Sequence, residues 1–164
     1  MKTCLVGCGG IAAVHGSVLT SDIDTEFVAA ADIKPKKAQT YAENFHTKPY
    51  PSLESMLEAE KPDVLHICTP HYLHVPMAIY SLERNINVFM EKPPAISFDQ
   101  LEELKKAAAK SEAQLGFCYQ NRYNASIRAA KDLIDSGKAG KVLGARAFVT
   151  WCRGAAYYTE SGWR

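Results

Sequence analysis

The segment Glu91-Lys92-Pro93 places an acid and a base before a rigid turn residue, directly after an apolar run at 86–90. A lysine beside a bound cofactor and substrate can donate hydrogen bonds to a reacting oxygen, and partial burial lets it exchange a proton. The alternative interpretation is a surface Glu–Lys pair before a proline turn. Because residue types alone do not separate the two interpretations, Lys92 is a candidate catalytic residue.

A glycine-rich segment, Gly7-x-Gly9-Gly10-x-Ala12, lies between an apolar run and a stretch with a helical pattern. In this motif the first glycine permits a tight turn and the second lets the backbone approach a pyrophosphate. The small Ala12 lets the helix pack on the strand, and the helix N-terminus faces the anion. The simpler alternative is a glycine-rich turn that binds nothing.

Asp32 ends a second apolar run 25 residues after Gly7, and this context makes the glycine motif specific for a dinucleotide. Its carboxylate would accept hydrogen bonds from the adenosine ribose hydroxyls. A 2′-phosphate would meet a like charge there, at a cost of up to ~4 kcal/mol per unit charge at 4 Å. The pattern favours NAD, with NADP possible because Lys34, Lys36 and Lys37 follow, although a solvated helix start explains these lysines more simply.

The run from Thr69 to His74 follows a third strong apolar run. His71 and His74 have a helical spacing that suits a metal ion, but no cysteine or carboxylate nearby completes the site, so we expect no metal. Contact with the cofactor, or capping of the next helix, is the better interpretation of Thr69, Pro70 and His74. His66, inside the apolar run, is interpreted as a hydrogen-bonded core histidine.

Short apolar runs alternate with amphipathic stretches along residues 1–120. The runs predict strands at 3–6, 27–31, 64–68, 86–90 and 115–119, and the stretches between them predict helices. Continuous apolar strands separated by amphipathic helices indicate a parallel sheet covered on both faces. Right-handed crossovers then favour a Rossmann-type, doubly wound α/β fold. Ligands bind such folds at the carboxyl ends of the strands, where the segments described above would meet.

From about Asn121 the pattern changes. A helix is predicted over 121–136, followed by a strand over 141–153 whose alternate residues are apolar, as in a half-buried antiparallel sheet. One helix and one strand cannot make a sheet. We therefore expect two domains: residues 1–120, which bind a dinucleotide, and a second domain that begins near residue 121 and is cut off at residue 164.

The composition is that of an ordinary globular protein: 164 residues, a net charge of +1, 23% charged and 47% hydrophobic residues. Residues 1–120 carry a net −4 and residues 121–164 a net +5, but the basic residues are spaced out, so no nucleic-acid partner is expected. Five cysteines without a CxxC pair indicate a reduced, cytoplasmic setting. No apolar run reaches the ~18 residues of a membrane helix, so no membrane partner is expected.

The sequence resembles the glucose-fructose oxidoreductase, inositol dehydrogenase and MocA family (Gfo/Idh/MocA). Members of this family are NAD(P)-dependent oxidoreductases that act mostly on sugars, cyclitols or their derivatives. The matching segments span the chain in order: Gly7-Cys8-Gly9-Gly10-Ile11-Ala12 with His15, Ala31-Asp32, Thr69-Pro70-x-x-Leu73-His74, Glu91-Lys92-Pro93, Gln120-Asn121-Arg122-Tyr123 and Trp163-Arg164.

The resemblance implies hydride transfer between a nicotinamide cofactor and a sugar- or cyclitol-like substrate, with Lys92 reaching the reacting oxygen. It places Arg122 near the nicotinamide end. The residues that it places around the cofactor are Gly7, Gly9, Gly10, Ile11, Asp32, Thr69, Pro70, His74, Glu91 and Lys92.

The resemblance also limits what this chain is expected to do alone. By the resemblance, residues 121–164 form the truncated start of an α/β substrate domain, and the acid–base histidine of the family usually comes from a later segment of that domain. We therefore expect that the 164-residue chain is not competent by itself. The parent enzyme is expected to be a homo-oligomer. The alternative is a regulatory or sensor module that binds NAD(P) without chemistry. Lys92 argues against this alternative, because a sensor does not need that lysine.

Overall fold

The computed structural model of the chain describes residues 1–159, so the match at Trp163-Arg164 lies outside the described residues. The chain divides into two compact units, Met1–Cys118 and Tyr119–Arg164. The expected boundary after residue 120, and the assignment of the second part to a substrate domain, stay predictions. Within the described part, no helix has the length and apolar character needed to cross a membrane.

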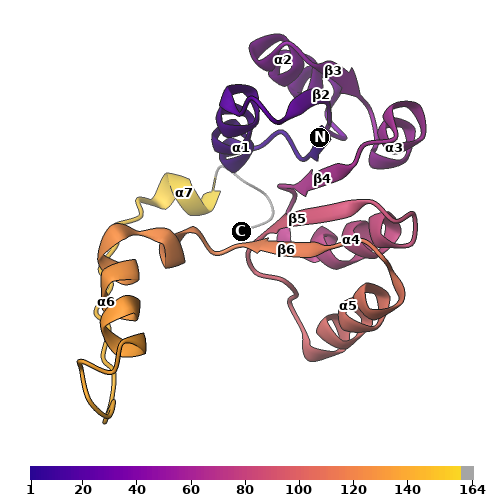
Figure 1. Cartoon of the computed structure of the whole chain (residues 1–164). Coiled ribbons are helices and arrows are strands. Elements are labelled where there is room, and N and C mark those ends of the chain that lie inside the picture. The colour runs from indigo at the N-terminus through magenta and orange to yellow at the C-terminus, as the bar shows by residue number, and fades with distance from the viewer. Residues whose placement is uncertain (160–164) are drawn as a thin grey trace. The chain divides into compact units, whose positions relative to one another are not determined.

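The first unit is built on a parallel sheet of six strands in the order β3-β2-β1-β4-β5-β6 (Figure 1). All neighbouring strands run parallel, and the order reverses between β1 and β4. This topology confirms the predicted Rossmann-type, doubly wound fold. The strands are β1 Lys2–Val6, β2 Glu26–Ala31, β3 Lys48–Tyr50, β4 Val64–Ile67, β5 Asn87–Glu91 and β6 Leu115–Cys118.

Helices connect the strands, and serine side chains cap the N-termini of two of them. Ser52 accepts a hydrogen bond from the Ser55 main-chain N–H, and Ser97 accepts one from that of Gln100. The Gln100 side chain accepts the main-chain N–H of Ile96 and not that of Ser97, so Ser97 and Gln100 do not form a reciprocal capping box. The helices are α1 Gly10–Ser21, α2 Pro35–Phe45, α3 Leu53–Glu60, α4 His74–Leu82 and α5 Phe98–Lys110, with a 3-10 turn, η1, at His71–Leu73.

Alternate strand residues pack against different helices, which explains why the strands are apolar throughout. Cys4 and Val6 belong to the larger core with α3, α4 and α5, whereas Leu5 belongs to a smaller cluster with α1 and α2. The Tyr41 hydroxyl of α2 donates to the Ala12 carbonyl oxygen of α1 at 2.7 Å. Ala12 is fully buried in the smaller cluster, as the glycine motif predicts.

Strand β3 was not predicted. It contains only Lys48-Pro49-Tyr50, which lacks an apolar run, and proline disfavours a strand assignment. The strand lies at the edge of the sheet, beside β2 alone, where a missing N–H does not interrupt a ladder.

In the second unit, the helix predicted over 121–136 is divided: a 3-10 turn η2, Gln120–Tyr123, precedes α6, Ala125–Asp135. The prediction of a strand over 141–153 was wrong, because the segment has no regular structure before α7, Ala155–Thr159. Leu143 is 91% exposed. An alternating pattern forms a strand only when a neighbouring strand exchanges main-chain hydrogen bonds with it, and no described residue does so here.

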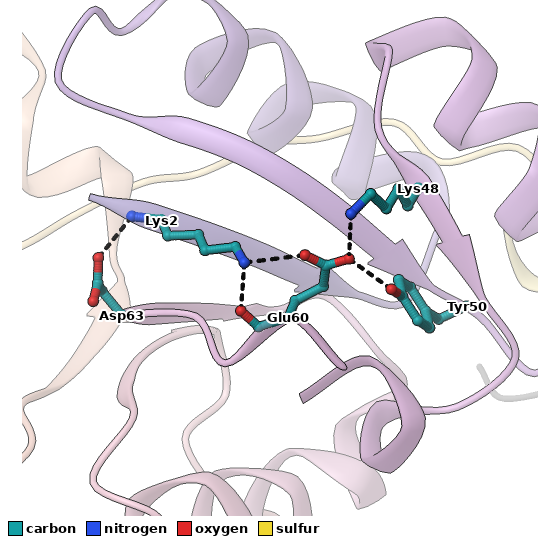
Figure 2. Close-up of polar contacts among 5 residues, drawn as sticks. All are labelled: Lys2, Lys48, Tyr50, Glu60 and Asp63. Atoms are coloured by element: carbon teal, nitrogen blue, oxygen red, sulfur yellow. Dashed lines mark hydrogen bonds and ion pairs between the residues drawn. The ribbon is translucent and has the colours of Figure 1, made fainter. Parts of the chain in front are cut away.

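A buried carboxylate, that of Glu60 at the end of α3, links this helix to β1 and β3 (Figure 2). It accepts hydrogen bonds from the Tyr50 hydroxyl at 2.6 Å and the Lys48 ammonium at 2.9 Å, and the Lys2 ammonium lies 3.1 Å away. The main-chain N–H of Lys2 donates to the Asp63 carboxylate at 2.7 Å. The hydrogen bonds, that of Tyr50 first, lower the pKa of Glu60 to about 2 although burial alone would raise it.

We expect Glu60→Gln to lower the free energy of unfolding at pH 7 by about 1–3 kcal/mol, because it removes the charge that three donors stabilise. The pKa of Glu60 is about 2 in the folded chain against an ordinary 4.5, so this contribution is complete above pH 4.5 and is lost as the pH falls through 2. The difference in unfolding free energy between the wild type and Glu60→Gln, measured by urea unfolding, should therefore be smaller at pH 3 than at pH 7.

The matched control for this prediction is Glu58→Gln, an exposed position on the same helix, which should change the unfolding free energy by less than about 0.5 kcal/mol. A stability gap for Glu60→Gln of the same size at both pH values would contradict the assignment of the pKa to this network.

Candidate functional site

Four of the predicted site segments lie at the carboxyl ends of neighbouring strands. The glycine segment that starts at Gly7 follows β1, and Asp32 follows β2. Thr69 and Pro70 come after β4, and Lys92 comes after β5. Because all these strands are parallel, their carboxyl ends share one edge of the sheet. The order reverses between β1 and β4, and this is the point where doubly wound sheets bind ligands.

The turn after β1 depends on Gly7. Its φ is +93°, and a Cβ at this position would lie 2.7 Å from the main-chain carbonyl carbon of Cys68. Its N–H donates to the Ala31 carbonyl oxygen at 2.8 Å. The ends of β2 and β4 therefore hold the turn from both sides, and only glycine fits.

Gly9 and Gly10 differ from Gly7, since a Cβ on either would meet no atom within 4 Å. Gly9 is the N-cap of α1, and no side chain in the described part of the chain caps this end of the helix. The Ala12 N–H donates to the Gly9 carbonyl oxygen at 3.1 Å, whereas the N–H groups of Gly10 and Ile11 have no hydrogen-bond partner among the described residues, and such groups bind phosphate. Both observations fit a diphosphate at this helix terminus.

Both carboxylate oxygens of Asp32 accept main-chain hydrogen bonds. The N–H of Cys8, inside the glycine segment, donates at 2.9 Å, and the N–H of Lys34 donates at 2.8 Å. These hydrogen bonds fix the Asp32 carboxylate beside the glycine turn. Burial, and then the Asp32 charge, raise the pKa of the Cys8 thiol to about 12, which keeps it protonated and unreactive. Lys34, Lys36 and Lys37 are exposed.

Thr69 and His74 border the site on the β4 side. The Thr69 hydroxyl oxygen is buried, and none of residues 1–159 supplies it with a hydrogen-bond partner. His74 is fully buried: its Nδ1 lies 2.8 Å from the Pro93 carbonyl oxygen and its Nε2 lies 3.0 Å from that of Thr69. With both ring nitrogens against carbonyl oxygens, His74 joins the two loops and offers no nitrogen to a metal ion. Its assignment as a cofactor contact stays a prediction.

His15 was not singled out by chemical reasoning on the sequence, yet it lies at the centre of a buried polar network. Its Nε2 lies 3.1 Å from Glu91 Oε1, and its Nδ1 lies 2.9 Å from His66 Nδ1. The interpretation of His66 as a hydrogen-bonded histidine is confirmed. Burial, and then the charge of His15, lower the pKa of His66 to about 4.

Cys118, at the end of β6, completes this network. Burial alone would raise the pKa of Glu91, but hydrogen bonds from His15 and the Cys118 thiol lower it. The donor atoms of His15, Glu91 and Cys118 lie within 4.8 Å of one another, and their N, O and S atoms are of the kinds that bind zinc. The expectation of no metal was based on neighbouring sequence and did not consider this set.

Lys92 is exposed, and its ammonium makes no hydrogen bond or ion pair with any residue that the structure describes. Its main-chain N–H donates to Glu91 Oε2 at 3.2 Å, and the Lys92–Pro93 peptide bond is cis. Arg122 lies in η2 of the second unit and is also exposed. The roles predicted for Lys92 and Arg122 remain predictions.

Comparisons with known proteins agree with this geometry. Residues 1–119 match a family described as an oxidoreductase family with an NAD-binding Rossmann fold. D-glucoside 3-dehydrogenase of Escherichia coli is 28% identical over 99% of this chain and 46% of its own length. An inositol 2-dehydrogenase/D-chiro-inositol 3-dehydrogenase of Lacticaseibacillus casei is 28% identical over 90% of this chain and 44% of its own.

Among solved structures, the WlbA dehydrogenase of Bordetella pertussis, in complex with NADH and UDP-GlcNAcA, aligns with a TM-score of 0.91. It is 30% identical and covers 99% of this chain, which covers 50% of it. The fold and the sequence match define an oxidoreductase class with a Rossmann domain that binds NAD. Within that class, this chain belongs to the Gfo/Idh/MocA family. It spans about half the length of the curated relatives it matches.

We expect Gly7→Ala to destabilise the chain by at least about 2 kcal/mol, because the new Cβ meets main-chain atoms at 2.7 Å and the φ is positive. Gly10→Ala, whose Cβ enters open space, is the matched control and should change stability by less than about 1 kcal/mol. Urea unfolding measures both variants. Equal effects at the two positions would refute the contact with β4.

Proposed function

We propose that the protein to which this chain belongs transfers hydride between a nicotinamide cofactor and a sugar- or cyclitol-like substrate. The observation that carries the proposal is the meeting, at one sheet edge, of an open glycine turn, an anchored carboxylate at Asp32 and the exposed Lys92. The names of the relatives support the substrate class, because they act on a glucoside and on inositols.

In this proposal, the residues at the sheet edge hold the cofactor by different groups. Gly9 and Gly10 leave room for the diphosphate beside the N-terminus of α1, and Asp32 accepts hydrogen bonds from the ribose. The buried hydroxyl of Thr69 gains the partner that residues 1–159 do not supply. The bound cofactor supplies hydride transfer at its nicotinamide ring. The remaining proposed contacts are Gly7, Ile11, Pro70, His74, Glu91, Lys92 and Arg122.

We propose NAD as the preferred cofactor, with NADP as the weaker ligand. Both oxygens of Asp32 are fixed by main-chain N–H groups, so the carboxylate cannot easily move away from a 2′-phosphate. The exposed side chains of Lys34, Lys36 and Lys37 offset part of this repulsion.

Lys92 is the proposed catalytic residue. Its ammonium is exposed at the ligand edge, where it can donate a hydrogen bond to the substrate oxygen at the carbon that exchanges hydride. During oxidation of a carbinol, Lys92 as an uncharged amine accepts the hydroxyl proton and becomes an ammonium. During reduction of a carbonyl, the ammonium returns this proton to the substrate oxygen.

Titration calorimetry on the 164-residue chain tests the cofactor site. We expect NAD to bind more tightly than NADP by about tenfold or more, and Asp32→Ser to reduce that ratio to near one. Asp24→Ser, an exposed acid before β2, is the control and should leave the ratio unchanged. Absence of heat with either cofactor at millimolar concentration would overturn the proposed function.

The role of Lys92 is tested in the whole protein with an accepted sugar or cyclitol. Lys92→Ala should weaken cofactor binding by less than about threefold but lower kcat by at least about 100-fold, because the proton must then move without a positioned group. Lys110→Ala, an exposed lysine at the end of α5, is the control. Unchanged turnover in Lys92→Ala would remove the lysine from the mechanism. Cofactor binding without turnover in the wild type would favour the regulatory or sensor module.

A further inference from the structure

We propose that His15 is a positioning residue for Lys92, acting through the carboxylate of Glu91. This inference rests on the proposed function, in which Lys92 handles the substrate proton. His15 is on α1, the helix that begins at the glycine turn, whereas Glu91 is the last residue of β5. The contact between them therefore joins the diphosphate end of the site directly to the lysine end.

The main chain around Lys92 is held from both sides. On one side, Glu91 Oε2 accepts the Lys92 main-chain N–H at 3.2 Å, while Oε1 lies 3.1 Å from His15 Nε2. On the other side, the Pro93 carbonyl oxygen lies 2.8 Å from His74 Nδ1. The turn at 91–93 is thus fixed by two histidines from two different helices, while the ammonium of Lys92 has no partner among residues 1–159 and can meet a ligand.

The carboxylate of Glu91 needs the donor that His15 provides. Its side chain is 6% exposed, as is that of His15, and a buried carboxylate without donors is strongly disfavoured. With hydrogen bonds from His15 and Cys118, Glu91 stays ionised and can only accept hydrogen bonds. An ionised Glu91 therefore continues to accept the N–H of Lys92, which keeps the lysine in one place.

The His15 ring is itself held in one orientation. Its Nδ1 contacts His66 Nδ1 at 2.9 Å, so one of the two rings donates there and the other accepts. Phe89 of β5 packs beside both rings, with centroids 6.0 Å from His15 and 5.1 Å from His66. The titratable groups that face His15 are His66, Glu91 and Cys118. Because His15 is constrained at both ring nitrogens, it holds the Glu91 carboxylate in a fixed position.

The test compares two substitutions at His15 in the whole protein. His15→Gln keeps a side-chain N–H that can reach Glu91, whereas His15→Leu fills similar space without a donor. We expect His15→Leu to lower kcat by about 10- to 100-fold with the KM for NAD changed less than about threefold, because the lysine and not the cofactor is misplaced. His15→Gln should restore kcat to within about fivefold of the wild type. His46→Gln, an exposed histidine after α2, is the control.

Glu91→Gln provides a second, independent variant. If His15 acts through Glu91, adding His15→Leu to Glu91→Gln should lower kcat by less than about threefold more, because the link is already broken. This measurement also covers the case in which His15→Leu folds poorly, since Glu91→Gln alone should then reproduce the loss of kcat with the KM for NAD changed by less than about threefold. Urea unfolding of each variant identifies losses that come from stability alone.

The outcomes separate this inference from the proposed function. NAD binding and turnover by the wild type are measured first, and their absence defeats the proposed function itself. An active wild type with unchanged kcat in both His15→Leu and Glu91→Gln overturns the positioning role and leaves the proposed function standing. Equal losses in His15→Leu and His15→Gln, or fully multiplicative effects with Glu91→Gln, also overturn it.

Discussion

The first unit depends on how closely the end of β1 passes the end of β4. At Gly7 the separation leaves no room for a side chain, because a Cβ would lie 2.7 Å from main-chain atoms of Cys68. This approach is possible only with glycine in a left-handed conformation. The chain then enters α1 at the point where the strand order reverses. The N-terminus of α1 therefore lies at the edge of the sheet that the carboxyl ends of the strands form.

The remainder of the candidate site is arranged around that helix. Asp32 secures the glycine turn through the N–H of Cys8, and Tyr41 secures α1 through the carbonyl of Ala12. Further along the same helix, His15 reaches across the sheet to Glu91. One helix therefore contributes both the N-terminus that is proposed to bind the diphosphate and a buried polar link to β5. Because a single rigid helix joins the glycine turn to the end of β5, the two parts of the candidate site keep a fixed distance from each other.

Much of the sheet, and the position of several candidate site residues at its edge, could be predicted from the sequence, because both leave local patterns. Apolar runs marked five of the six strands, and Gly7, Asp32 and Lys92 were found from their places after such runs. Strand β3 has no such pattern, since pairing with β2 alone creates it.

The polar network was missed for a different physical reason. His15 and Glu91 are 76 residues apart, and nothing in the residues around His15 indicates which strand it will face. The segment 141–153 shows the converse: it has the alternation of a strand but no partner among the described residues, and alternation without a partner does not make a ladder.

The two margins of the sheet are chemically unequal. At the β3 margin, Pro49 lacks an N–H, so the outer ladder there cannot be extended without interruption. At the β6 margin, Leu115–Cys118 contains no proline and pairs with β5 only, within the part of the chain that is described. Outward-facing amides and carbonyls of β6 can therefore accept one more strand in continuous register. A further strand can therefore pair continuously with the sheet at the β6 edge but not at the β3 edge.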